Sequence, residues 1–418
     1  MTEPIKARYD IYVNTISLGV MKAAEAILLE EGGLLTRFGF RYTENYIDQP
    51  LAFALDPVQL PLTRSEFLFA CRNGIPGILD DYLPDDWGRK VLARLALYRH
   101  QKKINRHSCV DTLSELGNSR IGALQWVSDG KAPQYESGAA LSHLSEAELA
   151  AQLIDKPENY PEQLDELSLL YLANAGTGVG GARPKALLYE GAEHYLAKFN
   201  RLSQDPYNNA RVELACLKLA ELAGLEVFSG RVREGVNGRE VLLLNRFDII
   251  TKGRCHYRKH LITANAMLKE PSSQRDHSGV FRYDDIVTLI RRYSFDVEKD
   301  LTQLLRMMLF NRAINNTDNH ERNFSFMHTE NGYRLAPAYD MVPTLSTGEY
   351  PAAGYHYSPQ PPLPSEAKTM GKVFGLPKTQ VRKIAEEVEN AVQQWSVIAA
   401  QTGVECSDIA AVAKVIKW

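Results

Sequence analysis

The sequence predicts an α+β fold divided into more than one domain, on three observations. The chain has 418 residues, whereas a single domain usually contains roughly 100–200. Residues 184–250 follow the pattern strand, strand, helix, strand, strand, which is typical of a small antiparallel sheet with one helix packed against it. From about Asp284 onward the pattern is mostly helical. We therefore expect two or three domains, in which a sheet-bearing part precedes a helical part.

The composition is that of an ordinary globular protein. Hydrophobic residues make up 44 %, charged residues 24 % and aromatic residues 9 %, which disfavours disorder, collagen-like repeats and coiled coil. The net charge of −3 provides no global field to hold nucleic acid, although it is compatible with a local basic patch. The cysteines are scattered without a CxxC pair, which argues against a zinc site or a disulfide framework and favours reduced, mostly buried thiols (Cys71, Cys109, Cys216, Cys255, Cys406).

The N-terminal segment MTEPIKARYD lacks the apolar core of a signal peptide. No apolar stretch approaches the roughly 18 residues that a membrane span needs. We therefore expect a cytoplasmic protein with no membrane partner.

The N-terminal part is expected to begin with strands and continue with helices. Residues 9–21 mix β-branched and aromatic residues with a turn-prone Asn14, which predicts a short hairpin, and a second strand-like region covers 37–54. A helix is expected from Asp85 or Asp86, because acidic residues suit the positive end of a helix dipole.

Ser145 and Glu148 have the spacing of a capping box that opens another helix. The prolines between 157 and 161 break that pattern, and we place a domain boundary nearby. The predicted division has an N-terminal domain, a sheet-bearing core and a helical C-terminal part (1–160, 161–250, 251–418).

The elements of the core follow from local patterns. Residues 184–200 predict two strands around a glycine turn, and 210–225 predict a helix that ends at Gly224. Residues 227–250 predict a hairpin that turns at Asn237 and Gly238. Beyond them we expect two helices, a short strand pair, a Pro-rich loop and two last helices (284–293, 301–316, 323–328 with 332–340, 351–365, 378–400 and 407–417).

The first pattern with chemical meaning is GTGVGGARPK (176–185), which has four glycines in six residues. Successive N–H groups of such a loop can surround an anion, because glycine has no Cβ in the way. A flexible linker or a tight turn would have the same composition. It is not a Walker A loop, because Ala186 rather than Ser or Thr follows Lys185.

The second feature with chemical meaning is Lys198 in the predicted strand YLAKFN. A lysine in a mostly apolar strand either reaches outward to solvent or is held inward by an anion. Lys198 lies 13 residues after Lys185, on the strand that returns from the Gly-rich loop. A kinase sheet carries its phosphate-binding lysine in such a place. Glu213 on the following helix is one candidate partner for it.

The strongest pattern is NTDNHERNFSF (316–326) followed by APAYDMVPT (336–344). Asp318 and Asn323 have the D-x-x-x-x-N spacing of a kinase catalytic loop, and Asp340 follows Asp318 by 22 residues. A carboxylate there can accept the proton of an attacking hydroxyl. An amide oxygen with a second carboxylate suits Mg²⁺, which prefers oxygen ligands. Positioning and charge neutralisation would then supply the catalysis; the alternative is a simple Asp- and Asn-rich turn.

His320 lies inside this loop, where it could orient Asp318 or contact phosphate. No HxxxH or HExxH spacing supports zinc catalysis.

With these motifs in order, the chain resembles the HipA family of serine/threonine protein kinases, which are toxins of bacterial type II toxin–antitoxin pairs. The resemblance covers nearly the whole chain. It rests on GIPGILDDYLPDDWGRKVL and SRIGALQW in the N-terminal part and, above all, on the core motifs VGGARPKALL, YLAKFN, LLLNRFD, NTDNHERNFSF and APAYDM. It implies a bilobal protein-kinase-like fold, whose N-lobe has antiparallel sheets and whose C-lobe is helical.

The resemblance also implies a role for each matching residue. Asp318 would be the catalytic base, and Asn323 and Asp340 would hold Mg²⁺. Lys198 would contact the ATP phosphates. Further nucleotide contacts would come from the Gly-rich loop, the hinge at adenine and the catalytic loop (Gly180, Gly181, Ala182, Arg183, Lys185, Asn245, Arg246, Phe247, His320, Asn323).

Known members of the family phosphorylate aminoacyl-tRNA synthetases and thereby stall translation. Their partners are small helix-turn-helix antitoxins, through which the toxin is attached to operator DNA. For this chain the resemblance therefore implies a protein substrate, growth arrest, an antitoxin partner and a DNA contact that is indirect.

The chain departs from the family pattern at two positions. Gly178 stands where autophosphorylating members have a serine, so self-phosphorylation cannot occur there. Either Thr177 is modified instead, or the protein is not switched off in this way, or the position was changed for study. Asn245 stands where an acidic hinge residue is common, but hinge contacts are mainly made by the backbone.

Two other functions compete with the protein kinase. A small-molecule kinase of the aminoglycoside or choline type shares the D-x-x-x-x-N spacing and the later Asp, but the N-terminal motifs argue against it. A catalytically weak nucleotide-binding module that bridges an antitoxin to DNA is the other, and the intact Asp318, Asn323 and Asp340 argue against that.

Overall fold

In the computed structural model, contacts between residues divide the chain into two units, each assembled from separate segments. Unit 1 comprises Met1–Phe199, Asn245–Ser278 and Met327–Glu330, and unit 2 comprises Asn200–Leu244, Gly279–Phe326 and Asn331–Trp418. The structure describes residues 4–72, 74–101, 103–136, 138–154, 169, 172, 183–201, 205–235, 240–253, 255–270 and 280–418. The predicted three-way division of the chain stays a prediction.

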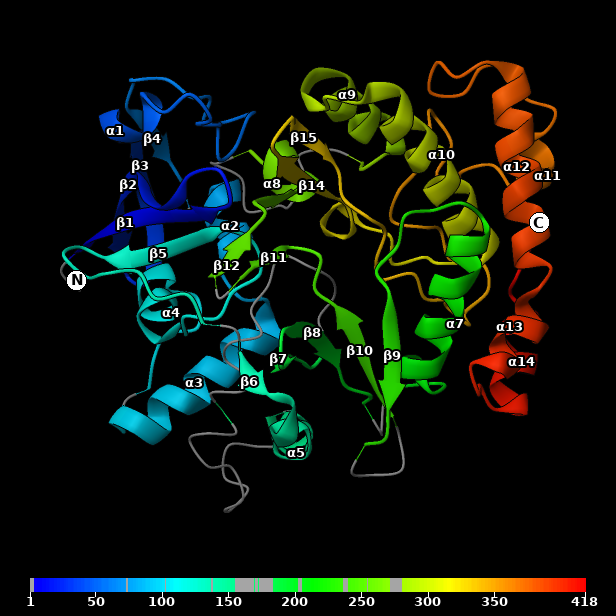
Figure 1. The fold of residues 1–418 in the computed structure, drawn as a ribbon, viewed down its shortest axis with the longest axis horizontal. Coiled ribbons are helices and arrows are strands. Elements are labelled where there is room, and N and C mark those ends of the chain that lie inside the picture. The colour runs from blue at the N-terminus through cyan, green and yellow to red at the C-terminus, as the bar shows by residue number, and fades with distance from the viewer. Residues whose placement is uncertain are drawn as a thin grey trace. The chain divides into compact units, whose positions relative to one another are not determined.

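Unit 1 contains a five-stranded antiparallel sheet with the strand order β4 (Phe67–Ala70), β3 (Leu34–Tyr42), β2 (Gly19–Glu31), β1 (Ile5–Thr15) and β5 (Leu124–Ser128) (Figure 1). Its core face carries aromatic residues at alternate positions, as in β3, where Phe38, Phe40 and Tyr42 are buried. Phe38 packs near Trp126 of β5, with 6.2 Å between ring centroids.

The predicted N-terminal hairpin is present, but its turn was misplaced. Asn14 lies inside β1 opposite Val20, and the turn follows Thr15. The Asn14 side chain instead donates a hydrogen bond to the His256 carbonyl at 3.0 Å, so a tertiary contact overrides its turn preference. The strand-like region 37–54 is the end of β3 followed by the short helix α1 (Glu44–Ile47).

Four further helices lie in the described residues of the N-terminal part of unit 1. They are α2 (Gly77–Tyr82), α3 (Asp86–His100), α4 (Cys109–Glu115) and α5 (Leu144–Ile154). The predicted start of α3 is confirmed, because Asp85 is its N-cap and accepts a hydrogen bond from the Gly88 N–H at 2.8 Å. The predicted capping box is wrong: a 3₁₀ turn (Leu141–His143) opens α5, so Ser145 already lies inside the helix.

The remaining described strands of unit 1 include the two that carry Lys185 and Lys198. β6 (Ala139–Ala140) pairs in parallel with β7 (Lys185–Glu190), which pairs antiparallel with β8 (Glu193–Lys198). Gly191 forms the predicted turn with a φ of +61°, in the left-handed region that favours glycine. Later segments add a hairpin, a short strand and a helix: β11 (Ile249–Lys252), β12 (Cys255–Arg258), β13 (Leu261–Thr263) and α8 (Ala264–Leu268).

Unit 2 begins with the predicted helix and hairpin. α7 (Asn209–Leu222) is followed by Gly224 with a φ of +80°, and β9 (Gly230–Arg233) pairs antiparallel with β10 (Val241–Asn245). The hairpin turn predicted at Asn237 and Gly238 lies outside the described residues.

The helical part of unit 2 is built around α10 (Val297–Ala313), whose buried face includes Leu304, Leu305, Met308 and Phe310. The other elements are α9 (Tyr283–Tyr293), a 3₁₀ turn (Glu321–Asn323), β15 (Gly332–Leu335), α11 (Pro364–Ala367), α12 (Lys378–Val392), α13 (Trp395–Gln401) and α14 (Cys406–Ala413). The strand β14 (Ser325–Thr329) begins in unit 2, and its residues from Met327 onward belong to unit 1. Helices α10 and α12 lie side by side in Figure 1.

The helix predicted over 378–400 is broken in two after Val392. Trp395 is buried, and its indole N–H donates to the Ile409 carbonyl at 3.0 Å. This contact joins α13 to α14.

All five cysteines are free, and Cys71, Cys109 and Cys216 are buried, as predicted. Among the described residues, no helix is long and apolar enough to cross a membrane.

A buried carboxyl in unit 1 is expected to make stability depend on pH. Asp56 is 1 % exposed, and its Oδ1 accepts hydrogen bonds from the N–H groups of Val58 and Gln59 at 2.9 and 3.1 Å. Burial raises its pKa from 3.8 to about 7. The folded state therefore binds a proton that the unfolded chain has lost, so stability should fall as the pH rises from about 4 to 7.

We expect Asp56→Asn to remove this part of the pH dependence, because the amide oxygen keeps both hydrogen bonds and carries no charge. The variant should be more stable than the wild type at pH 8, by a few kcal/mol at most, since one pKa unit corresponds to about 1.4 kcal/mol. Urea unfolding at pH 5 to 8 measures this. Asp48→Asn, at a carboxyl that is 60 % exposed, is the control. Parallel pH profiles for wild type and Asp56→Asn would show that the carboxyl titrates normally.

Candidate active site

The segment between α10 and β14 places two of the predicted catalytic residues in one tight loop of unit 2. The Asp318 N–H donates to Asn316 Oδ1 at 3.1 Å, and the Asp318 carbonyl accepts a hydrogen bond from Asn323 Nδ2 at 2.7 Å. These bonds fix the backbone of Asp318, while its side chain is 73 % exposed. The loop therefore presents a carboxylate to solvent on a backbone that is hydrogen-bonded on both its N–H and its carbonyl.

Asn323 lies at the end of the 3₁₀ turn and is 6 % exposed. Its Nδ2 donates a hydrogen bond to the Asp318 carbonyl. Its Oδ1 is buried and accepts no hydrogen bond from the residues that the structure describes. Burying an acceptor without a partner costs free energy of folding. A bound ion or water molecule often interacts with such an atom. An amide oxygen of this kind fits a hard cation such as Mg²⁺.

Asp340 has an unusual backbone conformation. Its φ is +58°, in the left-handed region, and it is 8 % exposed. Aspartate is one of the few residues besides glycine that enters this region readily. Such a conformation persists only when the surrounding structure holds it, and it is often found at functional sites.

Asn316 connects the two halves of the site. Its Nδ2 donates to Asn311 Oδ1 at 3.1 Å and to the Asp340 carbonyl at 3.3 Å, while its Oδ1 accepts from the Asp318 N–H. One buried side chain thus holds both the loop that carries Asp318 and the left-handed backbone of Asp340. The sequence alone assigns no role to Asn316, which is one of several polar residues in its motif.

Tyr283, at the start of α9, is hydrogen-bonded to two asparagines of this region. Its hydroxyl accepts hydrogen bonds from Asn319 Nδ2 at 2.9 Å and from Asn311 Nδ2 at 3.3 Å. Burial raises the pKa of Tyr283 to about 12, so the hydroxyl stays neutral. Asn311, Asn316 and Asn319 therefore form one buried polar network with Tyr283, in which each amide has a defined orientation.

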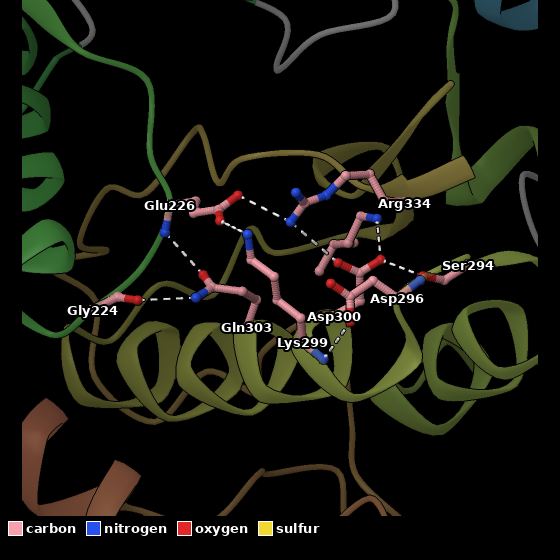
Figure 2. Close-up of polar contacts among 9 residues, drawn as sticks. Gly224, Glu226, Ser294, Asp296, Lys299, Asp300, Gln303 and Arg334 are labelled. Atoms are coloured by element: carbon pink, nitrogen blue, oxygen red, sulfur yellow. Dashed lines mark hydrogen bonds and ion pairs between the residues drawn. The ribbon is translucent and has the colours of Figure 1, made fainter. Parts of the chain in front are cut away.

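A second polar network, shown in Figure 2, ties the segment before Asp340 to α10. Asp300 is fully buried and accepts hydrogen bonds from the Leu335 N–H at 2.6 Å and from Ser294 Oγ at 2.7 Å. Burial raises the pKa of Asp300. Arg334 lies 3.1 Å from Glu226 and 3.5 Å from Asp300 and so bridges the two carboxylates.

Glu226 also contacts Lys299, at 2.5 Å, and its carbonyl accepts a hydrogen bond from the Ala338 N–H at 2.7 Å. The backbone two residues before Asp340 is therefore hydrogen-bonded to Glu226, whose side chain binds Lys299 and Arg334.

His320 lies beside Asp318 without a hydrogen bond to it. Its Nε2 is 3.9 Å from Asp318 Oδ1, and the side chain is 31 % exposed. The structure thus brings Asp318, His320 and Asn323 together, as their spacing suggested.

The two lysines that are expected to contact phosphate lie opposite each other in unit 1. Lys185 on β7 pairs in register with Lys198 on β8, and they are 4 % and 6 % exposed. Lys185 Nζ lies 3.2 Å from Asp85 Oδ2. Asp85 was identified from the sequence only as a helix start.

The predicted hinge residues differ in what their side chains do. The Arg246 N–H donates to the His194 carbonyl at 2.8 Å, and its guanidinium binds Asp248 at 2.6 and 3.0 Å. Burial alone would raise the pKa of Asp248, but the Arg246 charge lowers it below its usual value. The Arg246 side chain is thus committed to a buried ion pair, while Asn245 is exposed and Phe247 half-buried.

Of the Gly-rich loop only its last residues are described, including half-buried Arg183. Thr177, Gly180, Gly181 and Ala182 lie outside the described residues, as does Gly178.

Comparison with known proteins identifies the family. The model of the HipA-like C-terminal domain matches residues 177–395, and that of the HipA N-terminal domain matches residues 13–127. A protein of Sinorhizobium fredii named "Putative kinase Y4mE" is 25 % identical over 348 residues, covering 75 % of this chain and 73 % of its own length. "Toxin YjjJ" of Escherichia coli is 24 % identical over 289 residues, covering 65 % of this chain and 61 % of that protein.

Among solved structures, HipA from Shewanella oneidensis, in a complex with HipB and operator DNA, superposes with a TM-score of 0.65. The two are 18 % identical, and the match covers 97 % of this chain and 94 % of that chain. It confirms the predicted α+β, kinase-like HipA fold. Because the C-terminal model alone spans more than half of the chain and the N-terminal model precedes it in order, this protein belongs to the HipA family.

Proposed function

We propose that the protein is an ATP-dependent serine/threonine protein kinase that acts as the toxin of a toxin–antitoxin pair. The observation that carries this proposal is the catalytic loop, in which an exposed carboxylate, Asp318, stands on a backbone fixed by Asn316 and Asn323. The kinase and toxin names of the two relatives support it. A translation factor such as an aminoacyl-tRNA synthetase is the expected substrate, and its phosphorylation would arrest growth.

In the proposed reaction a serine or threonine hydroxyl of the substrate attacks the γ-phosphorus of ATP. The Asp318 carboxylate accepts the hydroxyl proton, the new bond joins the hydroxyl oxygen to phosphorus, and the bond to the β–γ bridging oxygen breaks to release ADP. Lys198 and the Gly-rich loop would bind the phosphates, and the backbone of 245–247 would bind adenine.

Asn323 and Asp340 are the residues that would hold Mg²⁺. The buried Oδ1 of Asn323, which accepts no hydrogen bond from any described residue, fits this role. A divalent cation there would neutralise charge on the transferring phosphoryl group. The network around Asn316 would keep both side chains in place before substrate arrives, as positioning catalysis requires.

The partner is expected to be a small helix-turn-helix antitoxin, with any DNA contact made through it. The Shewanella HipA structure contains HipB and operator DNA. We extend that arrangement to this chain as part of the proposal.

Incubation with γ-labelled ATP and Mg²⁺, alone and with a lysate of the same cells, tests the proposal. Mass spectrometry of labelled sites should identify a serine or threonine of a lysate protein. Label on Thr177 would show that self-phosphorylation occurs without a serine at position 178. ATP binding without any transfer would instead support the module that bridges an antitoxin to DNA. Labelling of a small molecule alone would support a small-molecule kinase.

Asn316→Asp is expected to lower the rate of transfer about tenfold or more. The substitution keeps the size of the side chain but turns a donor toward Asn311 Oδ1 and the Asp340 carbonyl into a third acceptor. Leaving buried groups unpaired costs about 1–3 kcal/mol, and about 1.4 kcal/mol of barrier is tenfold in rate.

Asn315→Asp is the matched control for Asn316→Asp. Asn315 Nδ2 also donates two hydrogen bonds, to the carbonyls of Thr344 and Ser346 at 2.6 and 3.1 Å, but neither acceptor belongs to Asp318 or Asp340. Steady-state kinetics should show a larger fall in kcat for Asn316→Asp. Equal losses in the two variants would argue against a special role for Asn316.

A further inference from the structure

Two buried lysines on one face of a sheet require negative charge nearby. Lys185 and Lys198 are direct partners in the antiparallel pair of β7 and β8, so their side chains leave the sheet on the same face. Both are more than nine-tenths buried. Like charges placed opposite each other are unfavourable, and burying an ammonium group without a counter-ion is costly.

The N-terminal domain supplies one such counter-ion. Asp85 Oδ2 lies 3.2 Å from Lys185 Nζ, although the two residues are 100 positions apart in the sequence. The carboxylate cannot easily turn away, because its Oδ1 accepts the capping hydrogen bond from the Gly88 N–H. It belongs to residues 13–127, the part of the chain that matches the HipA N-terminal domain.

We propose that Asp85 is a built-in competitor for phosphate at Lys185. A nucleoside triphosphate that reaches this face of the sheet must share the Lys185 ammonium group with Asp85 or displace Asp85 from it. The N-terminal domain would thereby lower the affinity for polyphosphate anions and couple the position of α3 to nucleotide binding. The inference rests on the proposed function only in taking ATP as the natural anion.

The chemistry of Asp85 suggests a clean test. Asparagine caps a helix about as well as aspartate, so Asp85→Asn keeps the bond to Gly88 and removes only the charge that faces Lys185. The neighbouring Asp86 is the matched control, because its carboxylate is 75 % exposed and pairs with Lys90 at 3.3 Å on the helix surface. Thermal unfolding of both variants checks that the helix start is intact.

We expect Asp85→Asn to bind ATP and inorganic tripolyphosphate roughly 3- to 30-fold more tightly than the wild type, as measured by calorimetry without Mg²⁺. Asp86→Asn should bind both as the wild type does. In a Lys185→Met background the gain from Asp85→Asn should disappear, because the ammonium group for which carboxylate and phosphate compete is gone.

Unchanged or weaker tripolyphosphate binding by Asp85→Asn would overturn the inference, and so would a gain that persists in the Lys185→Met background. Failure of the proposed kinase function would look different. In that case no variant transfers phosphate, while the gain in tripolyphosphate affinity for Asp85→Asn remains. If wild type and Asp85→Asn both fail to bind tripolyphosphate, the competition does not exist and the inference is wrong.

Discussion

Asp318→Asn should reduce phosphoryl transfer by roughly 10²–10⁴-fold, the usual effect of losing a general base. The amide has the size of the carboxylate but cannot accept the hydroxyl proton. The measurement is transfer from γ-labelled ATP to the labelled protein found in the lysate. Binding of ATP should change little, because the substitution removes a group that acts on the attacking hydroxyl.

The fold should tolerate this change. The hydrogen bonds of Asp318 to Asn316 and Asn323 are made by its backbone, and its side chain is largely exposed. An exposed substitution of this kind usually changes stability by about 0.5 kcal/mol or less. Asp129→Asn, at an exposed carboxylate in unit 1, is the matched control and should transfer at the wild-type rate. Undiminished transfer by Asp318→Asn would show that another group is the base.

Asp340→Asn should abolish most of the Mg²⁺-dependent part of ATP binding and lower transfer by roughly 10²-fold or more, because a metal ion supplies several kcal/mol of charge stabilisation. Asparagine is the appropriate replacement, since it enters the left-handed region as readily as aspartate does. It therefore removes one negative charge without forcing the backbone out of its φ of +58°.

Calorimetric titration of the protein with ATP, once with Mg²⁺ and once with EDTA, measures the effect of Asp340→Asn on ATP binding. The wild type should bind more tightly with Mg²⁺, whereas Asp340→Asn should bind nearly equally in both. Glu349→Gln, at an exposed carboxylate of unit 2, is the control and should behave as the wild type does. A full response to Mg²⁺ in Asp340→Asn would place the metal elsewhere.

The sequence predicted the parts of the fold and of the site that depend on local patterns. The strands on either side of Gly191, the helix that begins after Asp85 and the helix that ends at Gly224 all lie where short-range signals placed them. The spacing of Asp318 and Asn323 likewise corresponds to a real contact, since the Asn323 amide closes the loop on the Asp318 carbonyl.

What the sequence did not predict depends on contacts between distant residues. Asn316 was one polar residue among several in its motif, and its role follows only from its bonds to Asn311 and Asp340. Asp85 had a sufficient local explanation as an acidic residue at the positive end of a helix dipole, so nothing indicated its contact with Lys185. The break after Val392 has no local signal in the sequence, and the hydrogen bond from Trp395 to the Ile409 carbonyl joins two separate helices.

The interleaving of the two units limits how this protein can be inherited. The chain leaves unit 1 after Phe199, returns at Asn245, and crosses again around residues 278, 326 and 330. Tandem domains can be exchanged between genes because each is one uninterrupted stretch. Here a junction between residues 127 and 177 would leave both matched family domains whole but would separate the N-terminal part of unit 1 from its later segments, so an exchanged N-terminal part would have to repack against new versions of Asn245–Ser278 and Met327–Glu330.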